Sequence, residues 1–413
     1  MKPAGKFAIL LLVIGFAYGA LRWYQQTTGK SVVSLPGRSG AAGSGSDPSN
    51  GGGSGGEPAN VRGGELELIT SATKKGWLEK QAELFSARSG GKTTIRIRYI
   101  ETRAAMQAIL TGREKPVLWS PSSPIWAKRL AQVWTDPKFH PGEPPVIDTQ
   151  DNRRFRSYLR TPIVFLTTKE RARYLRPLLS GPDPWGAIRD LSLGKRSVPG
   201  MGGKFRFAHA DPLNANSGFL TIGMILDSYS RKSGGGDDLV RIASSAGFVQ
   251  YLTELERGLV YDEPVRGGSS ALVKAFLDNP SRYGVITSYE SSALDAARSY
   301  PDIAVIYPNP TVVSEQTVVV LSGKWVSPEQ QDAAQAFLEF LRQPDSLSEG
   351  VKGNFRAADE TGPALTDTLR RNREQGFQQN YSAIDLPPYD ALNAAAFQWR
   401  VHVARLSATA ARR

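Results

Sequence analysis

Short apolar runs and helix-spaced apolar positions alternate along the first part of the chain after residue 65. Strands are expected at residues 66–70, 94–100 and 116–119. Helices, with apolar side chains three or four positions apart, are expected at residues 74–86, 102–110 and 125–134. This alternation of strand and helix predicts a parallel, doubly wound α/β sheet with helices on its faces.

The pattern continues past a strand at residues 158–167, whose Pro162 predicts a sheet edge or a bend. Further strands are expected at residues 205–208, 284–287, 303–307 and 316–321. Further helices are expected at residues 185–191, 218–229, 248–257, 270–277, 290–299, 328–342 and 389–406. This order allows one large sheet or two lobes, and crossovers near 161–162 and 308–310 favour two lobes.

The first 28 residues have the pattern of a membrane anchor. Lys2 and Lys6 precede an apolar run from residue 7 to 21, and Trp23 and Tyr24 follow it. At about 1.5 Å per residue, residues 7–24 would extend roughly 27 Å, close to the thickness of a bilayer core. The lysines favour a cytoplasmic N-terminus, so we expect a single-pass protein of the cell membrane with an extracytoplasmic domain. The alternative is a cleaved signal and a secreted or periplasmic protein.

Residues 29–64 are expected to be a disordered tether, because runs of glycine and serine cannot bury enough apolar surface to fold. The remaining residues, of a chain of 413 that is 40% hydrophobic, are enough for a packed core.

Composition excludes several kinds of site. The chain has no cysteine and three histidines, so disulfides and thiolate sites are excluded and no metal site or cofactor is expected. His209 and Asp211 are expected to structure their loop. Glu290 is not accompanied by a hydrolase or metalloprotease motif, and we predict no enzyme activity. The net charge is +12, but an exported chain rarely meets nucleic acid, so nucleic acid is not an expected partner.

The segment from residue 205 to 220 (FRFAHADPLNANSGFL) carries the strongest functional signal. It predicts a strand, a polar loop and an apolar helix that Asn216 or Ser217 caps. The N–H groups at such a helix start can hold an anion or a polar ligand without a charged side chain.

Five segments together resemble bacterial extracellular solute-binding proteins of the type II periplasmic-binding-protein class, in the molybdate- and sulfate-binding-like branch that also occurs beside von Willebrand A domains. Besides the segment from 205 to 220, they are residues 69–73 (ITSAT), 119–126 (WSPSSPIW), 265–290 with VRGGSS and YGVITSYE, and 353–357 (GNFRA). The resemblance extends over residues 65–403.

The resemblance implies a two-lobed domain that closes by a hinge of two crossovers. Lobe 1 would contain residues 65–162 and 309–406, and lobe 2 residues 163–308. The implied ligand would lie between the lobes. It would be a small polar or anionic solute, and an oxyanion is one possibility that the resemblance offers. The implied ligand-binding residues are Ser71, Ser122, Ser123, Asn216, Ser217, Ser269 and Tyr289.

Two kinds of partner follow from this reading. The first is an ABC-type permease or a sensor that receives the solute. The alternative is a non-transport module that uses the same domain to bind a protein or another component of the cell envelope.

Overall fold

The computed structural model describes residues 63–404 apart from 200, 202–203, 237, 260 and 359–368. The expected anchor, residues 1–28, and all but the last two residues of the expected tether lie outside the described residues. No described helix combines the length and apolar character that crossing a membrane requires.

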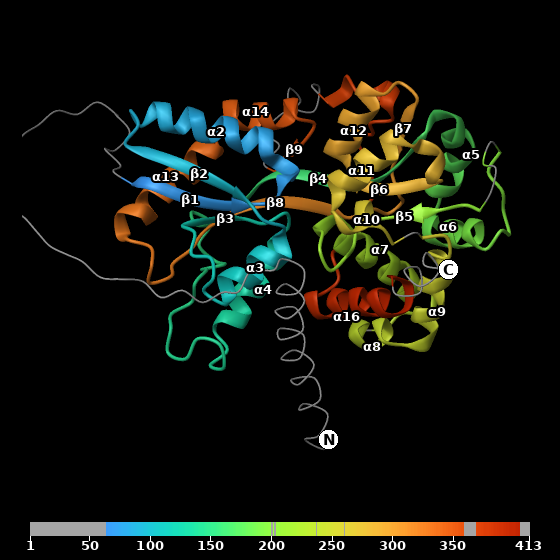
Figure 1. The fold of residues 1–413 in the computed structure, drawn as a ribbon, viewed down its shortest axis with the longest axis horizontal. Helices are drawn as coiled ribbons and strands as arrows, with labels where there is room; N and C mark the ends of the chain where they lie inside the picture. The colour runs from blue at the N-terminus through green and yellow to red at the C-terminus, as the bar shows by residue number, and fades with distance from the viewer. Residues whose placement is uncertain are drawn as a thin grey trace, which may run out of the picture. The chain divides into compact units, whose positions relative to one another are not determined.

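The described strands form a mixed sheet of nine strands in the order β2-β1-β3-β8-β4-β6-β5, with β7 and β9 also paired to β4. The strands are β1 (Gly64–Thr70), β2 (Thr93–Tyr99), β3 (Leu118–Ser120), β4 (Phe155–Thr168), β5 (Phe207–Ala208), β6 (Val285–Tyr289), β7 (Ile303–Ile306), β8 (Val313–Val320) and β9 (Arg356–Ala357). We call β1–β3 with their helices lobe 1, and β5–β7 with their helices lobe 2 (Figure 1).

Strand β4 runs through both lobes and changes partner at one proline. Pro162 pairs with Val313 of β8, whereas the next residue, Ile163, pairs with Tyr289 of β6. A proline has no N–H to give to a ladder, so it is tolerated where pairing is interrupted. The bend predicted at Pro162 is therefore the point at which the chain passes from one lobe to the other.

Helices cover both faces of the lobe 1 sheet: α2 and α14 lie on one side, and α3 and α4 on the other (Figure 1). The helical elements of lobe 1 come from two segments of the chain. They are η1 (Ala72–Lys74), α2 (Lys75–Arg88), α3 (Thr102–Leu110) and α4 (Pro124–Trp134), and later α13 (Pro328–Leu341) and α14 (Pro344–Lys352).

The helices of lobe 2 come from the middle of the chain. They are α5 (Lys169–Leu179), α6 (Pro184–Ser192), α7 (Asn216–Lys232), α8 (Leu239–Ala243), α9 (Ala246–Leu255), α10 (Glu263–Arg266), α11 (Ser269–Asp278), η2 (Pro280–Arg282) and α12 (Glu290–Ser299). Near the C-terminus are η3 (Arg373–Gln375), α16 (Tyr389–Trp399) and the π-helical turn η4 (Arg400–Ala404).

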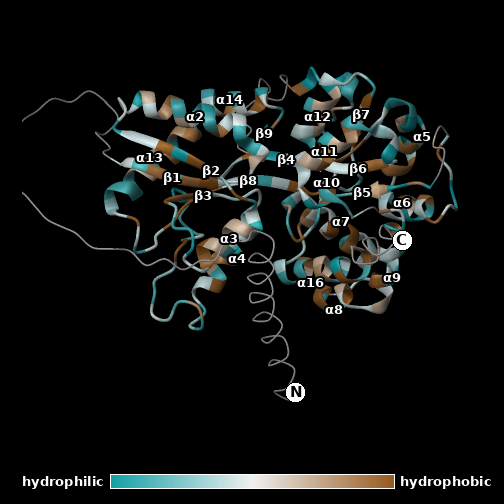
Figure 2. Cartoon of the chain, viewed as in Figure 1, coloured by the Kyte–Doolittle hydropathy of each residue, from teal (hydrophilic) through white to brown (hydrophobic). Residues whose placement is uncertain are grey.

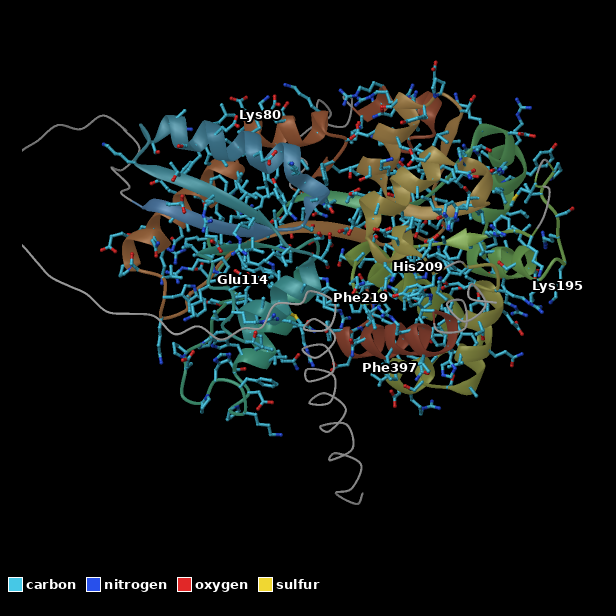
Figure 3. The ribbon with its side chains drawn as sticks, in the orientation of Figure 1. Lys80, Glu114, Lys195, His209, Phe219 and Phe397 are labelled. Atoms are coloured by element: carbon cyan, nitrogen blue, oxygen red, sulfur yellow. The ribbon has the colours of Figure 1, made fainter. Side chains whose placement is uncertain are left out.

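Helix α16 packs against both lobes, although the sequence analysis assigned its residues to lobe 1. It lies beside α7, α8 and α9 (Figure 1). Its Tyr389 ring also packs on two aromatic rings, at 5.6 Å from Trp126 of α4 and 5.7 Å from Phe219 of α7. Phe219, labelled in Figure 3, is fully buried in this cluster. Figure 2 shows that the apolar residues gather on the strands and the inner faces of the helices.

Candidate functional site

Loops that follow strands of both lobes meet where the lobes touch. Ser71 follows β1 and Ser122 follows β3, both from lobe 1, and Tyr289 ends β6 of lobe 2. Asn216 begins α7, and Ser314 belongs to β8. We call the place where these five residues meet the junction. All five are buried, with at most 4% of their surface exposed.

Asn216 is the centre of the junction. Its amide nitrogen donates to the Ser122 carbonyl at 3.2 Å, and it lies 3.1 Å from the Tyr289 hydroxyl. Its amide oxygen accepts a bond of 2.7 Å from the indole nitrogen of Trp126. Ser122 and Trp126 both belong to lobe 1, so a single lobe 2 side chain fixes lobe 1 against lobe 2.

The hydroxyls on the lobe 1 side form a chain. Ser71 Oγ and Ser122 Oγ are 2.8 Å apart, and Thr102 Oγ1 lies 3.5 Å from Ser122 Oγ. A hydroxyl can donate or accept, so these three hydroxyls can hydrogen bond either a donor group or an acceptor group of a ligand.

The remaining predicted residues are divided between two places. Ser217 and Ser269 hydrogen bond each other through their hydroxyls and join the starts of α7 and α11. Ser123 is buried at the start of α4, and its side chain does not cap that helix. The structure therefore brings Ser71, Ser122, Asn216 and Tyr289 together, and it pairs Ser217 with Ser269 beside them.

The predicted helix cap at Asn216 or Ser217 is wrong. Ala215 is the N-cap of α7, and no side chain caps this helix. The reason is that Asn216 and Ser217 lie within the first turn, where their side chains bond other loops instead of the helix backbone. The N–H groups at this helix start have no side-chain cap.

Lys74 was missed by sequence reasoning although it is buried behind Ser71. Its ammonium donates to Gln316 Oε1 at 3.0 Å and lies 3.5 Å from the Pro121 carbonyl. No carboxylate among the described residues forms an ion pair with it. Burial lowers the pKa of Lys74 to about 7, against the opposite effect of the Glu101 charge. A lysine in a helical apolar pattern gives no sequence signal for such a position.

Glu101 was missed as well. It is the N-cap of α3, it remains exposed, and it reaches from lobe 1 toward lobe 2. Its Oε1 lies 3.8 Å from the position that a β-carbon on Gly268 would occupy. Desolvation raises the pKa of this carboxyl, and the charge of Lys74 acts in the opposite direction.

A cavity of about 320 Å³ opens between the lobes on the α2 side of the junction. Its walls include Lys74 from lobe 1 and Ser291 and Asp295 from α12 of lobe 2. None of the seven predicted ligand-binding residues lines it. Lys74 and Thr73, whose hydroxyl accepts from Ser71, therefore connect this cavity with the junction.

Helix α16 joins the lobes on the side of α3 and α4. Arg103 of α3 donates to Asn393 at 3.0 Å, and Arg129 of α4 lies 3.4 Å from the Asp390 carboxylate. At its other end, Trp399 donates to the buried Glu256 of lobe 2 at 2.7 Å. Separation of the lobes on this side would break these contacts.

Glu290 and His209 have structural partners. Both carboxylate oxygens of Glu290 accept from the guanidinium of Arg356, at 2.9 and 2.6 Å, which fixes the 353–357 segment to α12. His209 Nε2 lies 2.9 Å from Glu256, and its Nδ1 lies 2.7 Å from the Ala210 carbonyl. No group of three or more metal-ligating side chains occurs among the residues that the structure covers.

The family of the chain is established by comparison with known proteins. A family model described as "Bacterial extracellular solute-binding protein" matches residues 66–348. The chain therefore belongs to this solute-binding family, as the sequence motifs predicted.

Curated relatives are longer than this chain. Two uncharacterized proteins of Mycobacterium tuberculosis, one each from strains CDC 1551 / Oshkosh and H37Rv, are 23% identical to it over 317 residues. The match covers 72% of this chain and 43% of each relative. The chain thus spans less than half the length of the curated relatives it matches.

Solved structures of binding proteins have the same fold. The sulfate-binding protein SubI of Mycobacterium tuberculosis superposes with a TM-score of 0.53 at 14% identity, covering 83% of this chain and 99% of SubI. AfuA of Actinobacillus pleuropneumoniae, with fructose-6-phosphate bound, gives 0.52 at 15% identity, covering 83% and 97%. An ABC transporter substrate-binding protein of Bradyrhizobium japonicum gives 0.55 at 13%, covering 82% and 99%. The type II periplasmic-binding-protein fold is confirmed.

Proposed function

We propose that this protein captures a small polar solute between its two lobes and presents it to a transporter or a sensor outside the cytoplasm. In this account the N-terminal segment holds the domain at the membrane, and the protein binds its ligand without chemical conversion. The partner would be an ABC-type permease or an envelope protein.

The observation that supports this proposal best is the convergence of neutral polar side chains from both lobes on the junction. Ser71 and Ser122 come from one lobe, and Asn216 and Tyr289 from the other. Buried polar groups are costly unless they are paired, and here they pair with one another across the two lobes. A solute that replaces some of these bonds would keep the lobes together.

The mechanism would be hinge closure. Strand β4 can bend near Pro162, where its partner changes from β8 to β6, and the second connection lies just before β8, which begins at Val313. The solute would enter while the lobes are apart and would be enclosed as Asn216 reaches Ser122. The oxyanion version of this function is supported by the hydroxyls and by the two helix starts without side-chain caps.

A melting-temperature screen of the full chain tests the proposal. The panel would contain amino acids, sugars, phosphorylated sugars, sulfate, molybdate and phosphate. A solute at 100 times its dissociation constant would stabilise the folded state by about 2.7 kcal/mol, which raises the melting temperature by several degrees. If no solute changes the melting temperature, the envelope-interaction reading replaces solute capture.

Site variants would locate the binding. Ser217→Ala removes one hydroxyl donor, and we expect it to weaken binding of the solute found in the screen by about 1–3 kcal/mol. Ser89→Ala is the control, because Ser89 bonds only to the backbone of lobe 1 at Ser86 and Thr93. Unchanged affinity in the Ser217 variant would place the ligand elsewhere.

A further inference from the structure

Glu101 brings a carboxylate of lobe 1 to the starts of two lobe 2 helices. The β-carbon position on Gly268 is 3.8 Å from Glu101 Oε1 and 3.9 Å from the β-carbon of Ala215. Gly268 is the N-cap of α11 and Ala215 the N-cap of α7. The carboxylate therefore lies beside the start of α11, which itself lies against the start of α7.

Neither helix start has a side-chain cap. Gly268 has no side chain, Ala215 has only a methyl group, and among the described residues no side chain accepts from the first N–H groups of α7 or α11. The first N–H groups of a helix and its dipole favour a negative charge. Glu101 supplies that charge from the opposite lobe.

The carboxylate is nevertheless available to a ligand. Glu101 is exposed, and within the described part of the chain its side chain forms no hydrogen bond and no ion pair. The lysine whose charge acts on it, Lys74, donates to Gln316 instead. Glu101 is thus a free acceptor at the edge of the junction.

A free carboxylate at this point has opposite effects on two classes of solute. A fully deprotonated oxyanion at the helix starts would lie beside a like charge in a region partly shielded from water, where repulsion is stronger than in bulk solvent. An amino group would find an acceptor of opposite charge, and the anionic part of the same solute could face Lys74. The side chains on the two edges of the junction are therefore suited to a zwitterion or an amine.

We propose that Glu101 determines the ligand class of the junction: it excludes fully deprotonated oxyanions such as sulfate and molybdate, and it accepts a hydrogen bond from the amino group of the solute that binds. This inference rests on the proposed function, and it replaces the oxyanion version with amino-bearing solutes. The recognition chemistry is a carboxylate–ammonium pair.

The test compares the full-length wild type with Glu101→Gln by titration calorimetry against sulfate, molybdate and a panel of amino acids. Glutamine has nearly the same shape and lacks the charge, and the position is exposed, so we expect the variant to fold. We expect Glu101→Gln to bind sulfate or molybdate about tenfold or more tightly than the wild type. We expect it to bind any amino acid that the wild type binds about tenfold or more weakly.

Two further variants make the result specific. Glu114→Gln removes the same charge from another position in lobe 1, where Glu114, labelled in Figure 3, is paired with Arg98, and we expect its anion binding to equal that of the wild type. Adding Lys74→Met to Glu101→Gln should remove the gained anion affinity, because Lys74 is the buried cation behind the site.

The outcomes separate this inference from the proposed function. Sulfate or molybdate binding by the wild type that is as tight as binding by Glu101→Gln overturns the role of Glu101, even if the wild type binds another solute. If Glu101→Gln gains affinity for sulfate or molybdate while the wild type binds no solute, the result supports the exclusion of anions by Glu101 and contradicts solute capture.

Discussion

Replacing the buried lysine of the junction should make the protein more stable at slightly acidic pH. Lys74 has 1% of its surface exposed, and burial lowers its pKa from 10.5 to about 7. A difference of about 3.5 pH units corresponds to a cost of about 5 kcal/mol for keeping the ammonium buried, at 1.36 kcal/mol per unit. Lys74→Met removes this cost and leaves Gln316 Oε1 without its donor, which costs about 1–3 kcal/mol.

The sign of the pH dependence follows from the direction of the pKa shift. The unfolded chain keeps the proton on Lys74 up to about pH 10.5, whereas the folded protein releases it near pH 7. Wild-type stability should therefore rise between pH 7 and 10.5 by up to about 1.4 kcal/mol per pH unit, relative to the Lys74→Met variant. The variant should be roughly 2–4 kcal/mol more stable at pH 6, and this advantage should disappear as the pH approaches 10.

Urea unfolding of both proteins between pH 6 and pH 10 measures this difference directly. Lys80→Met is the control, because Lys80 is an exposed residue of the adjoining helix α2, labelled in Figure 3 and paired with Glu349. Lower stability of Lys74→Met at pH 6, or a stability difference that does not change with pH, would refute the reasoning that Lys74 is buried at a cost.

Three other changes have expected outcomes. Burial lowers the pKa of His209, but Glu256 and the Ala210 carbonyl more than offset this, so its pKa is raised. The stabilisation from the His209–Glu256 pair should be complete below about pH 6.5 and should decline as the pH rises through the higher pKa of the folded state. In urea unfolding, His209→Phe should abolish this decline and should lower the free energy of unfolding by about 3–5 kcal/mol at pH 6. Asn216→Ala should cost about 1–3 kcal/mol and abolish solute binding by calorimetry. Trp399→Phe should leave Glu256 Oε2 without its indole donor, while His209 stays bonded to Oε1, and should speed proteolytic cleavage near α16, whereas unchanged cleavage would contradict the anchoring role of the indole.

The order of elements could be predicted from the sequence because apolar periodicity records which face of each element is buried. The helix at 102–110 and the helix at 290–299 are found within the predicted bounds, and strand β4 extends the predicted 158–167 at both ends. Helices α5 and α14 were not predicted. Helix α5 contains Pro177, and the apolar side chains of α14 after its first proline are only Leu347 and Val351.

The site could be predicted only in part, for a physical reason. Ser71, Ser122 and Tyr289 follow strands, and strand ends that meet at one edge bring such residues together. Lys74 and Glu101 acquire their properties from the approach of the other lobe: burial lowers the pKa of Lys74, and Gly268 of lobe 2 lies beside Glu101. The residues next to Lys74 and Glu101 in the sequence do not indicate that the other lobe packs there.

The position of α16 also depended on packing between distant segments. The sequence predicted a helix at 389–406 but assigned it to lobe 1, whereas Tyr389 contacts Trp126 at one end and Trp399 contacts Glu256 at the other. Both contacts join residues far apart in the chain, and periodicity alone cannot choose between two apolar surfaces.

The most direct test of solute capture is the distance between the lobes with and without solute. The chain has no cysteine, so a pair of spin labels can be placed through Leu84→Cys on α2 and Tyr174→Cys on α5, both of which are 46% exposed. Pulsed electron spin resonance of the labelled full chain would then report the distribution of distances between lobe 1 and lobe 2. The account predicts that the solute identified by melting narrows this distribution to a single closed distance, and that Asn216→Ala prevents the narrowing. A solute that raises the melting temperature but leaves the distribution unchanged would contradict capture between the lobes.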